Sequence, residues 1–314
     1  MLVGDAYGKV TCLLDGIDEF RENLVHAVSC EEIASVCDTE THTVTTGVFT
    51  FVITIALLTI TLLTQGKFKD LFTVKELLPK LLLIGIIGFS VNFTNFFGFK
   101  FGNEQTGAFL LKTDVLMVNF ASWLIYKERL TKKDWVFSLT MFIGVLMVIG
   151  TDFTKMTFNA GDIFFIISAV LLTWNTFNIS GILKQKKVPI SQMTVAYYNS
   201  LITMTLFITT FIATGAMDDI PIAFGSTGIL ISLVVSGLMQ YCLFLSYYKA
   251  LAELPAWVVK VILLLIPIIT MVLTIFIYGT VPTTTALIGC VIILVSAYGI
   301  IKEQNAKAQV QAGK

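Results

Sequence analysis

The chain of 314 residues is dominated by apolar side chains, which indicates the solvent in which it folds. Hydrophobic residues make up 56% of it and charged residues only 13%, whereas charged residues are about a quarter of a typical soluble domain. The mean hydropathy is +0.85, and the formal net charge is +0 at pH 7, so the basic excess that binds nucleic acid is absent. These values exclude an ordinary soluble domain and indicate a polytopic membrane protein.

The chain begins with an acidic, polar segment. Residues 1–45 contain nine acidic and two basic side chains, and their apolar stretches are short and interrupted by charges. Charges at bilayer depth are costly. No basic region followed by an apolar core stands at the start, so we expect no cleavable signal peptide. We interpret this segment as soluble.

From residue 46 onward, the sequence consists of apolar runs of about 20 residues, the length of a helix that crosses a hydrocarbon core. Because these runs are continuously apolar, they favour helices over barrel strands, which alternate apolar and polar residues. The predicted fold class is therefore all-α. Nine spans are predicted, at 46–64, 79–99, 105–126, 134–151, 161–184, 192–214, 225–247, 256–278 and 283–301.

Basic residues in every second loop orient the predicted helices. Lysine and arginine cluster at 67–80, 127–133 and 184–187, whereas the loop at 215–220 carries two aspartates. The positive-inside rule places the basic loops and the tail 302–314 in the cytoplasm. We therefore expect a multi-pass protein of the plasma membrane whose C-terminus is cytoplasmic.

One stretch of the chain occurs twice. Residues 98–131 are echoed by residues 250–283, 152 positions later, each with a small-residue turn and a helix-length apolar run. The first copy ends at a cytoplasmic basic cluster and the second at an uncharged link, so the two helices are expected to run in opposite directions. This pattern predicts an inverted repeat with halves at 46–151 and 152–301, an arrangement suited to alternating access.

Several segments resemble one family of membrane transporters. They are YKERLT at 126–131, Gly144, Trp174 within SAVLLTWNTF, and ALAELPAWVVKVILLLIP with Pro267. Their order and spacing resemble the EamA-type branch of the drug/metabolite transporter superfamily, over about residues 46–301. The resemblance implies ten helices in two five-helix halves, cytoplasmic termini and a central substrate cavity.

The sequence departs from that family pattern in three respects. Only four spans are predicted in the first half, so the first of the ten helices is missing from the prediction, and a truncated or mis-started reading frame is one explanation. Val115 stands where the second copy has Pro267, and Thr280 stands where the first copy has Glu128. An in-frame apolar segment upstream would restore the tenth helix.

Charged residues inside the predicted spans are the strongest indications of a site, because they are expensive in lipid and face protein or water. Lys112 and Asp114 are two positions apart in one span, about 200° apart around a helix, and cannot simply neutralise each other. Lys112 shares a helix face with Gln105 and Asn119, and we expect this face to line the cavity. Asp114 needs a partner on another helix, and is either structural or a proton-coupling carboxylate.

The second copy carries its own lysine. Lys260 lies one turn before Leu264, the counterpart of Lys112. We expect Lys112 and Lys260 to bind a carboxylate or similar group of a substrate. The alternative is that Lys260 reaches the cytoplasmic surface. Uncharged candidates for the same cavity, of which only a part is expected to touch substrate, are Asn95, Asn119, Asn175, Tyr197 and Gln240.

The predicted function is secondary transport of a small polar metabolite, amino-acid-like or another organic compound, by alternating access. The sequence has no phosphate-binding loop or nucleophile motif, so we expect neither a cofactor nor enzymatic activity. Expected partners are the substrate, membrane lipid and a coupling proton or other ion, with a homodimer left open and no nucleic acid. The alternatives are a proton/cationic-drug antiporter and a non-transporting membrane scaffold derived from a transporter.

Overall fold

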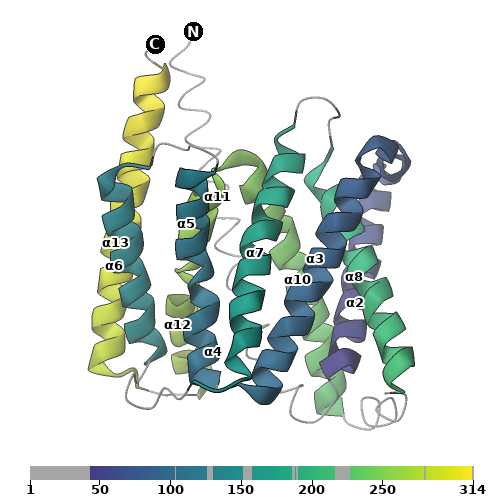
Figure 1. Ribbon diagram of the computed structural model, residues 1–314, viewed down its shortest axis with the longest axis horizontal. Coiled ribbons are helices and arrows are strands. Elements are labelled where there is room, and N and C mark those ends of the chain that lie inside the picture. Colours follow the sequence, from purple (N-terminus) through teal and green to yellow (C-terminus); the bar gives the residue numbers. More distant parts are fainter. Residues whose placement is uncertain are drawn as a thin grey trace.

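In a computed structural model, the described part of the chain consists of α-helices and two short 3-10 helices, without a strand among the described residues (Figure 1). This confirms the predicted all-α class. All but the last three residues of the predicted acidic segment 1–45 lie outside the description. The structure describes residues 43–102, 104–125, 130–150, 158–185, 188, 190–215, 227–278 and 281–312.

The helices of the described residues have the following bounds. In chain order they are α2 (Thr43–Thr64), η1 (Phe68–Phe72), η2 (Lys75–Leu77), α3 (Leu78–Phe101), α4 (Glu104–Lys112), α5 (Asp114–Leu124), α6 (Lys132–Ile149), α7 (Asp162–Leu183), α8 (Gln192–Thr214), α10 (Thr227–Glu253), α11 (Ala256–Leu263), α12 (Ile266–Tyr278) and α13 (Thr284–Ala312).

Capping residues explain where several helices begin and end. At the start of α6, Thr131 and Asp134 form a capping box, in which each side chain accepts a hydrogen bond from the other residue's backbone N–H. The Ser191 hydroxyl accepts from the backbone N–H of Thr194 at the start of α8. Helix α8 ends at Gly215, whose φ of 68° favours glycine.

Five helices are long and apolar enough to cross a membrane, and they coincide with five of the nine predicted spans. They are Val44–Thr64, Lys75–Phe101, Asp162–Leu183, Gln192–Thr214 and Thr284–Glu303. The predicted spans 105–126 and 256–278 each correspond to two shorter helices, α4 with α5 and α11 with α12. The count of nine spans, the domain limits and the repeat stay predictions.

The outside of the bundle is apolar. On α13, which packs along α6, Val291 is 60% exposed, Val295 63% and Tyr298 68%. Soluble monomers rarely expose large contiguous apolar patches, whereas lipid chains solvate such a surface without cost. The exposed face of α13 is therefore suited to lipid.

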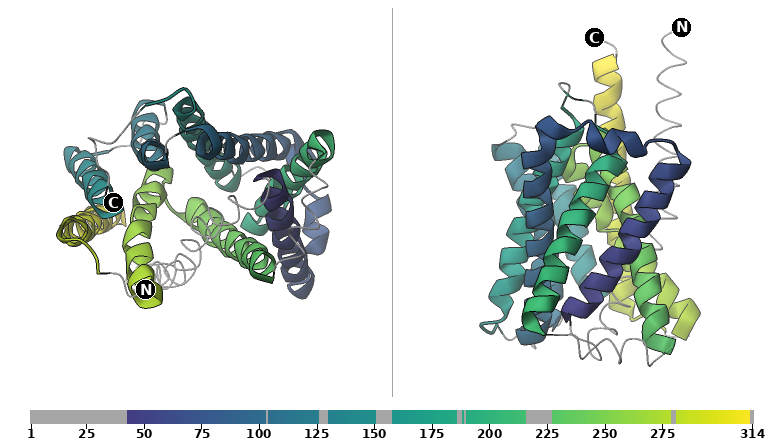
Figure 2. Two further views of the ribbon diagram at one scale, coloured as in Figure 1. Left: turned by 90° about the horizontal axis from the view of Figure 1, so that it is seen from below. Right: turned by 90° about the vertical axis from the view of Figure 1, so that its right-hand side faces the viewer.

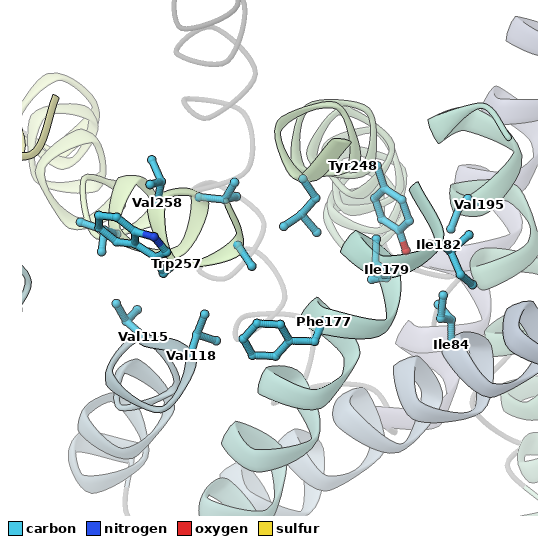
Figure 3. Close-up of a cluster of buried hydrophobic side chains, with 14 of the residues drawn as sticks. Ile84, Val115, Val118, Phe177, Ile179, Ile182, Val195, Tyr248, Trp257 and Val258 are labelled. Carbon is cyan, nitrogen blue, oxygen red and sulfur yellow. The ribbon is translucent and has the colours of Figure 1, made fainter. Parts of the chain in front are cut away.

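The bundle is elongated in cross-section (Figure 2). Helices α6 and α13 pack together at one end, and α2, α8 and α10 pack together at the other. Helix α7 packs against α3, α4 and α5 in the middle. A buried apolar cluster joins α5, α7, α10 and α11 through Val115, Phe177, Tyr248 and Trp257 (Figure 3).

Several basic segments share one end of the bundle. The start of α6, the end of α7 and the end of α13 lie at the end where the C-terminus is found (Figure 1). These segments carry Lys132, Lys133, Lys184 and Lys302. The positive-inside rule requires basic segments to share a side in this way. That this side is the cytoplasm stays a prediction.

Helices α6 and α13 approach closely where Gly144 faces Gly289. A Cβ on Gly289 would lie 2.6 Å from the Gly144 carbonyl oxygen and 2.9 Å from Met147 Cβ. We expect Gly289→Ala to lower the melting temperature of the purified protein, because overpacking costs about 1–3 kcal/mol. Gly181→Ala is the control, since no heavy atom lies within 4 Å of its added Cβ. Equal melting temperatures for the two variants would contradict this packing.

Candidate functional site

Two interrupted helices, α4 with α5 and α11 with α12, pack against each other through α5 and α11. Helix α11 begins 152 residues after α4 (256 against 104), and α12 begins 152 residues after α5 (266 against 114). In Figure 1, α5 lies above α4 whereas α12 lies below α11, so the two interrupted helices run in opposite directions. Interrupted helices place helix ends, with their partial charges, at membrane depth.

Both interruptions contain 3-10-type hydrogen bonds, such as that from the Leu264 N–H to the Val261 carbonyl in the second, but only the second contains a proline. In the second, Pro267 lacks a backbone N–H and so cannot continue the hydrogen bonding of α11. In the first, where Val115 stands in place of proline, the hydroxyl and the backbone N–H of Thr113 both donate to the carbonyl of Leu110. This 3-10-type bonding separates α4 from α5. The missing proline therefore does not remove the interruption.

A buried ion pair connects the two interrupted helices. The Lys260 Nζ of α11 donates to the Asp114 Oδ2 of α5 over 2.7 Å, and the side chains are only 3% and 7% exposed. Asp114 lies in the first turn of its helix and Lys260 in the last turn of its own. The helix dipoles favour an anion and a cation at those respective ends.

The burial of this pair sets it apart from a surface ion pair. The Lys133 Nζ and Glu303 Oε2 lie 3.5 Å apart with Lys133 71% exposed, where water screens the charges and little stability results. At the buried pair, removal of one partner would leave the other charge without compensation, which is strongly unfavourable. Asp114 and Lys260 therefore depend on each other.

An aromatic ring lies beside the lysine. The Lys260 Nζ is 5.6 Å from the centroid of the Tyr247 ring on α10, within the range of a cation–π interaction. The Tyr247 hydroxyl is hydrogen-bonded to Thr176 Oγ1 on α7 over 2.9 Å. Four helices thus meet at the ion pair. Sequence reasoning does not single out Thr176, because a lone threonine in an apolar helix carries no distinguishing signal.

Two predicted amides are buried without complete hydrogen bonding. Asn119 is 0% exposed, and neither its Nδ2 nor its Oδ1 has a hydrogen-bond partner within the described part of the chain. Asn175, next to Thr176 on α7, is 6% exposed, and its Oδ1 also lacks a partner there. Such groups cost about 1–3 kcal/mol each when left unsatisfied, so a polar partner would stabilise either amide.

The remaining predicted site residues lie on α3, α4, α8 and α10, and among them Tyr197 packs against the buried cluster that contains Val115 and Trp257. Lys112 is half-buried in the last turn of α4. Asn95 is half-buried on α3 and its Oδ1 lacks a partner in the described ranges. Tyr197 contacts the ring of Tyr198, and Gln240 is half-buried on α10. Their roles in binding stay predictions.

One sequence expectation stays a prediction and another needs correction. Lys112 and Asn119 lie on α4 and α5, on either side of the interruption at Thr113, so their shared polar face stays a prediction; the Gln105 side chain lies outside the described residues. The alternative in which Lys260 reaches the cytoplasmic surface is wrong, because only 3% of the side chain is exposed.

An apolar helical bundle with interrupted helices and charges at its centre is typical of membrane transporters. The sequence matches the EamA-like transporter family in two consecutive segments, residues 34–150 and 159–302. The chain therefore belongs to the EamA-like transporter family and is a multi-pass membrane protein.

The chain is also similar to individual known proteins, one by sequence and one by fold. The uncharacterized transporter YyaM of Bacillus subtilis (strain 168) is 27% identical over an alignment of 240 residues, which covers 72% of this chain and 75% of that protein. A solved structure, described only as the crystal structure of a protein, superposes with a TM-score of 0.74 at 17% identity, covering 90% of this chain and 94% of the other. That second likeness shows a shared fold.

Because Asp114 and Lys260 depend on each other, their single and double variants should differ in the free energy of unfolding. Asp114→Asn and Lys260→Met should each lower the free energy of unfolding by about 3–5 kcal/mol, because each leaves a buried charge unpaired. The double variant should regain most of the loss. Unfolding in mixed detergent micelles measures all three. Lys133→Met is the control, with an expected change below about 1 kcal/mol. Simply additive losses in the double variant would contradict the dependence.

Proposed function

We propose that the protein is a secondary transporter that moves a small polar metabolite, amino-acid-like or another organic compound, across the plasma membrane. The proposed mechanism is alternating access between the halves 46–151 and 152–301. The observation that carries the proposal is the buried ion pair between Asp114 and Lys260, because it connects an interrupted helix of one half to that of the other. Rocking of the halves would act directly on this contact.

The chemistry around the pair supports a polar substrate. Lys260 supplies a cation for a carboxylate or similar group, with Lys112 as the second predicted cation. Asn119 and Asn175 have amide atoms without hydrogen-bond partners in the described residues, and a polar substrate would satisfy them. A substrate that supplied these bonds would recover the desolvation cost of the two amides. An apolar substrate would leave that cost in place.

Asp114 is the proposed proton-coupling group. Its carboxylate is the hydrogen-bond acceptor of Lys260, so protonation would remove the charge that holds the lysine. The connection between α5 and α11 would then weaken, and the halves would separate more easily. The Asp114 carboxyl group would thereby link proton binding to the movement of the halves.

Transport by reconstituted protein tests this function. Proteoliposomes should take up at least one member of a mixture of radiolabelled amino acids, organic acids and organic amines. Lys260→Met, and Lys112→Ala to a smaller extent, should reduce that uptake, by about tenfold for loss of a hydrogen bond to a charged group. Asp114→Asn should abolish the response to an imposed pH gradient. Lys133→Met, in the exposed ion pair, is the matched control.

Three outcomes would count against the proposal. Unchanged uptake and unchanged pH response in Lys260→Met and Asp114→Asn would exclude the ion pair from the mechanism. Uptake restricted to organic cations would favour the proton/cationic-drug antiporter, with Asp114 as the shared site. Absence of uptake for every compound and gradient would favour the membrane scaffold.

A further inference from the structure

We propose that Tyr247 is a positioning residue whose ring holds the Lys260 ammonium whenever Asp114 is lost as its partner. The inference deepens the proposed function and rests on it, since transport supplies the occasion on which the ion pair opens. Its geometric basis is the 5.6 Å separation between the Lys260 Nζ and the centroid of the Tyr247 ring. This distance lies within the range over which an aromatic face attracts a cation.

Tyr247 and Lys260 belong to the same predicted half. Tyr247 lies near the end of α10 and Lys260 on α11, and these consecutive helices are packed against each other. Asp114, by contrast, lies on α5 in the other half. If the halves separate, the carboxylate moves away from the ammonium while the aromatic ring stays beside it. The ring is therefore placed to serve as the alternative partner.

The ring orientation is fixed from α7, which belongs to the same half. The Thr176 hydroxyl donates to the Leu172 carbonyl over 2.8 Å. Because a threonine hydroxyl has one hydrogen, the 2.9 Å bond between Thr176 Oγ1 and Tyr247 must be donated by the tyrosine. Thr176 is 1% exposed. A buried acceptor thus anchors the hydroxyl, and the Lys260 ammonium lies within reach of both the ring and the hydroxyl oxygen of the same tyrosine.

The physical reason for such a partner is the burial of the ammonium. Lys260 is 3% exposed while the pair is intact, so a partner that is already in contact with the ammonium is available as soon as the carboxylate moves away. A cation–π contact is strongest when the cation is desolvated. The ring attracts the ammonium without neutralising it, which allows the stronger interaction with Asp114 to re-form. The neighbouring Tyr248 has a different role, since its hydroxyl accepts from Asn199 Nδ2 over 2.8 Å.

A double-mutant cycle on the purified full chain tests the inference without a substrate. Tyr247→Leu should raise the unfolding equilibrium constant about tenfold more in an Asp114→Asn background than in the wild type, because the ring is then the partner that Lys260 retains. When Lys260→Met is also present, the effect of Tyr247→Leu should be the same with and without Asp114→Asn, because no ammonium remains for the ring to hold. Tyr247→Phe keeps the ring and loses the hydrogen bond to Thr176, so it should retain most of the coupling with Asp114→Asn that Tyr247→Leu removes.

Tyr241→Leu provides the matched control. Tyr241 also lies on α10, and its hydroxyl is likewise hydrogen-bonded to a threonine, Thr61, over 2.6 Å. The change in unfolding free energy caused by Tyr241→Leu should simply add to the change caused by Asp114→Asn. If Tyr247→Leu is also additive with Asp114→Asn, Tyr247 only fills space and the inference is overturned.

The transport assay with the labelled mixture supplies the functional readout. Tyr247→Leu should lower the maximal rate per folded protein about tenfold with little change in KM, and Tyr247→Phe should restore it. An unchanged rate and pH profile in Tyr247→Leu would overturn the role in opening. If the stability cycle is coupled but no variant transports, the contact with Lys260 stands and the proposed function fails. The two failures are therefore distinguishable.

Discussion

A bilayer cannot solvate an isolated charge, and this constraint organises the centre of the molecule. Asp114 and Lys260 are each acceptable at their buried positions because the other is 2.7 Å away. Each also lies at the helix end whose dipole favours its charge. The interruptions of the two helices create those ends. The ion pair, the breaks and the opposite directions of the helices therefore form one arrangement.

Such a pair is a poor device for stability alone. Buried ion pairs often contribute less than apolar residues of the same volume, because both charges must be desolvated. An ion pair weakens when one partner is protonated or when another charge competes for it. An apolar contact has no such response. Around it, the apolar shell of Val115, Val118 and Trp257 (Figure 3) excludes water and strengthens the electrostatic interaction. This combination suits a contact that opens and closes.

The sequence alone predicts the parts of this fold that depend on local pattern. Hydrophobic length identifies the five helices that can cross a membrane. The position of Asp114 within an apolar run already indicates a partner on another helix. The identity of that partner is not predictable, because Lys260 is 146 positions away and only the packing of α5 on α11 brings the two together. The first interruption is also hidden, since it depends on Thr113 rather than proline.

The same distinction applies to the rest of the site. Asn119 and Asn175 stand out in the sequence because amides are rare in apolar helices, and the structure places both in the interior. The orientation of Tyr247 depends on a hydrogen bond to Thr176 across two helices, which no local pattern encodes. The most direct test of the account is the distance between Lys260 Nζ and Asp114 Oδ2 in experimental structures captured with the cavity open to each side in turn. The account predicts an intact pair in one state and, in the other, a separation beyond about 4 Å with the ammonium against the Tyr247 ring; an intact pair in both states would contradict it.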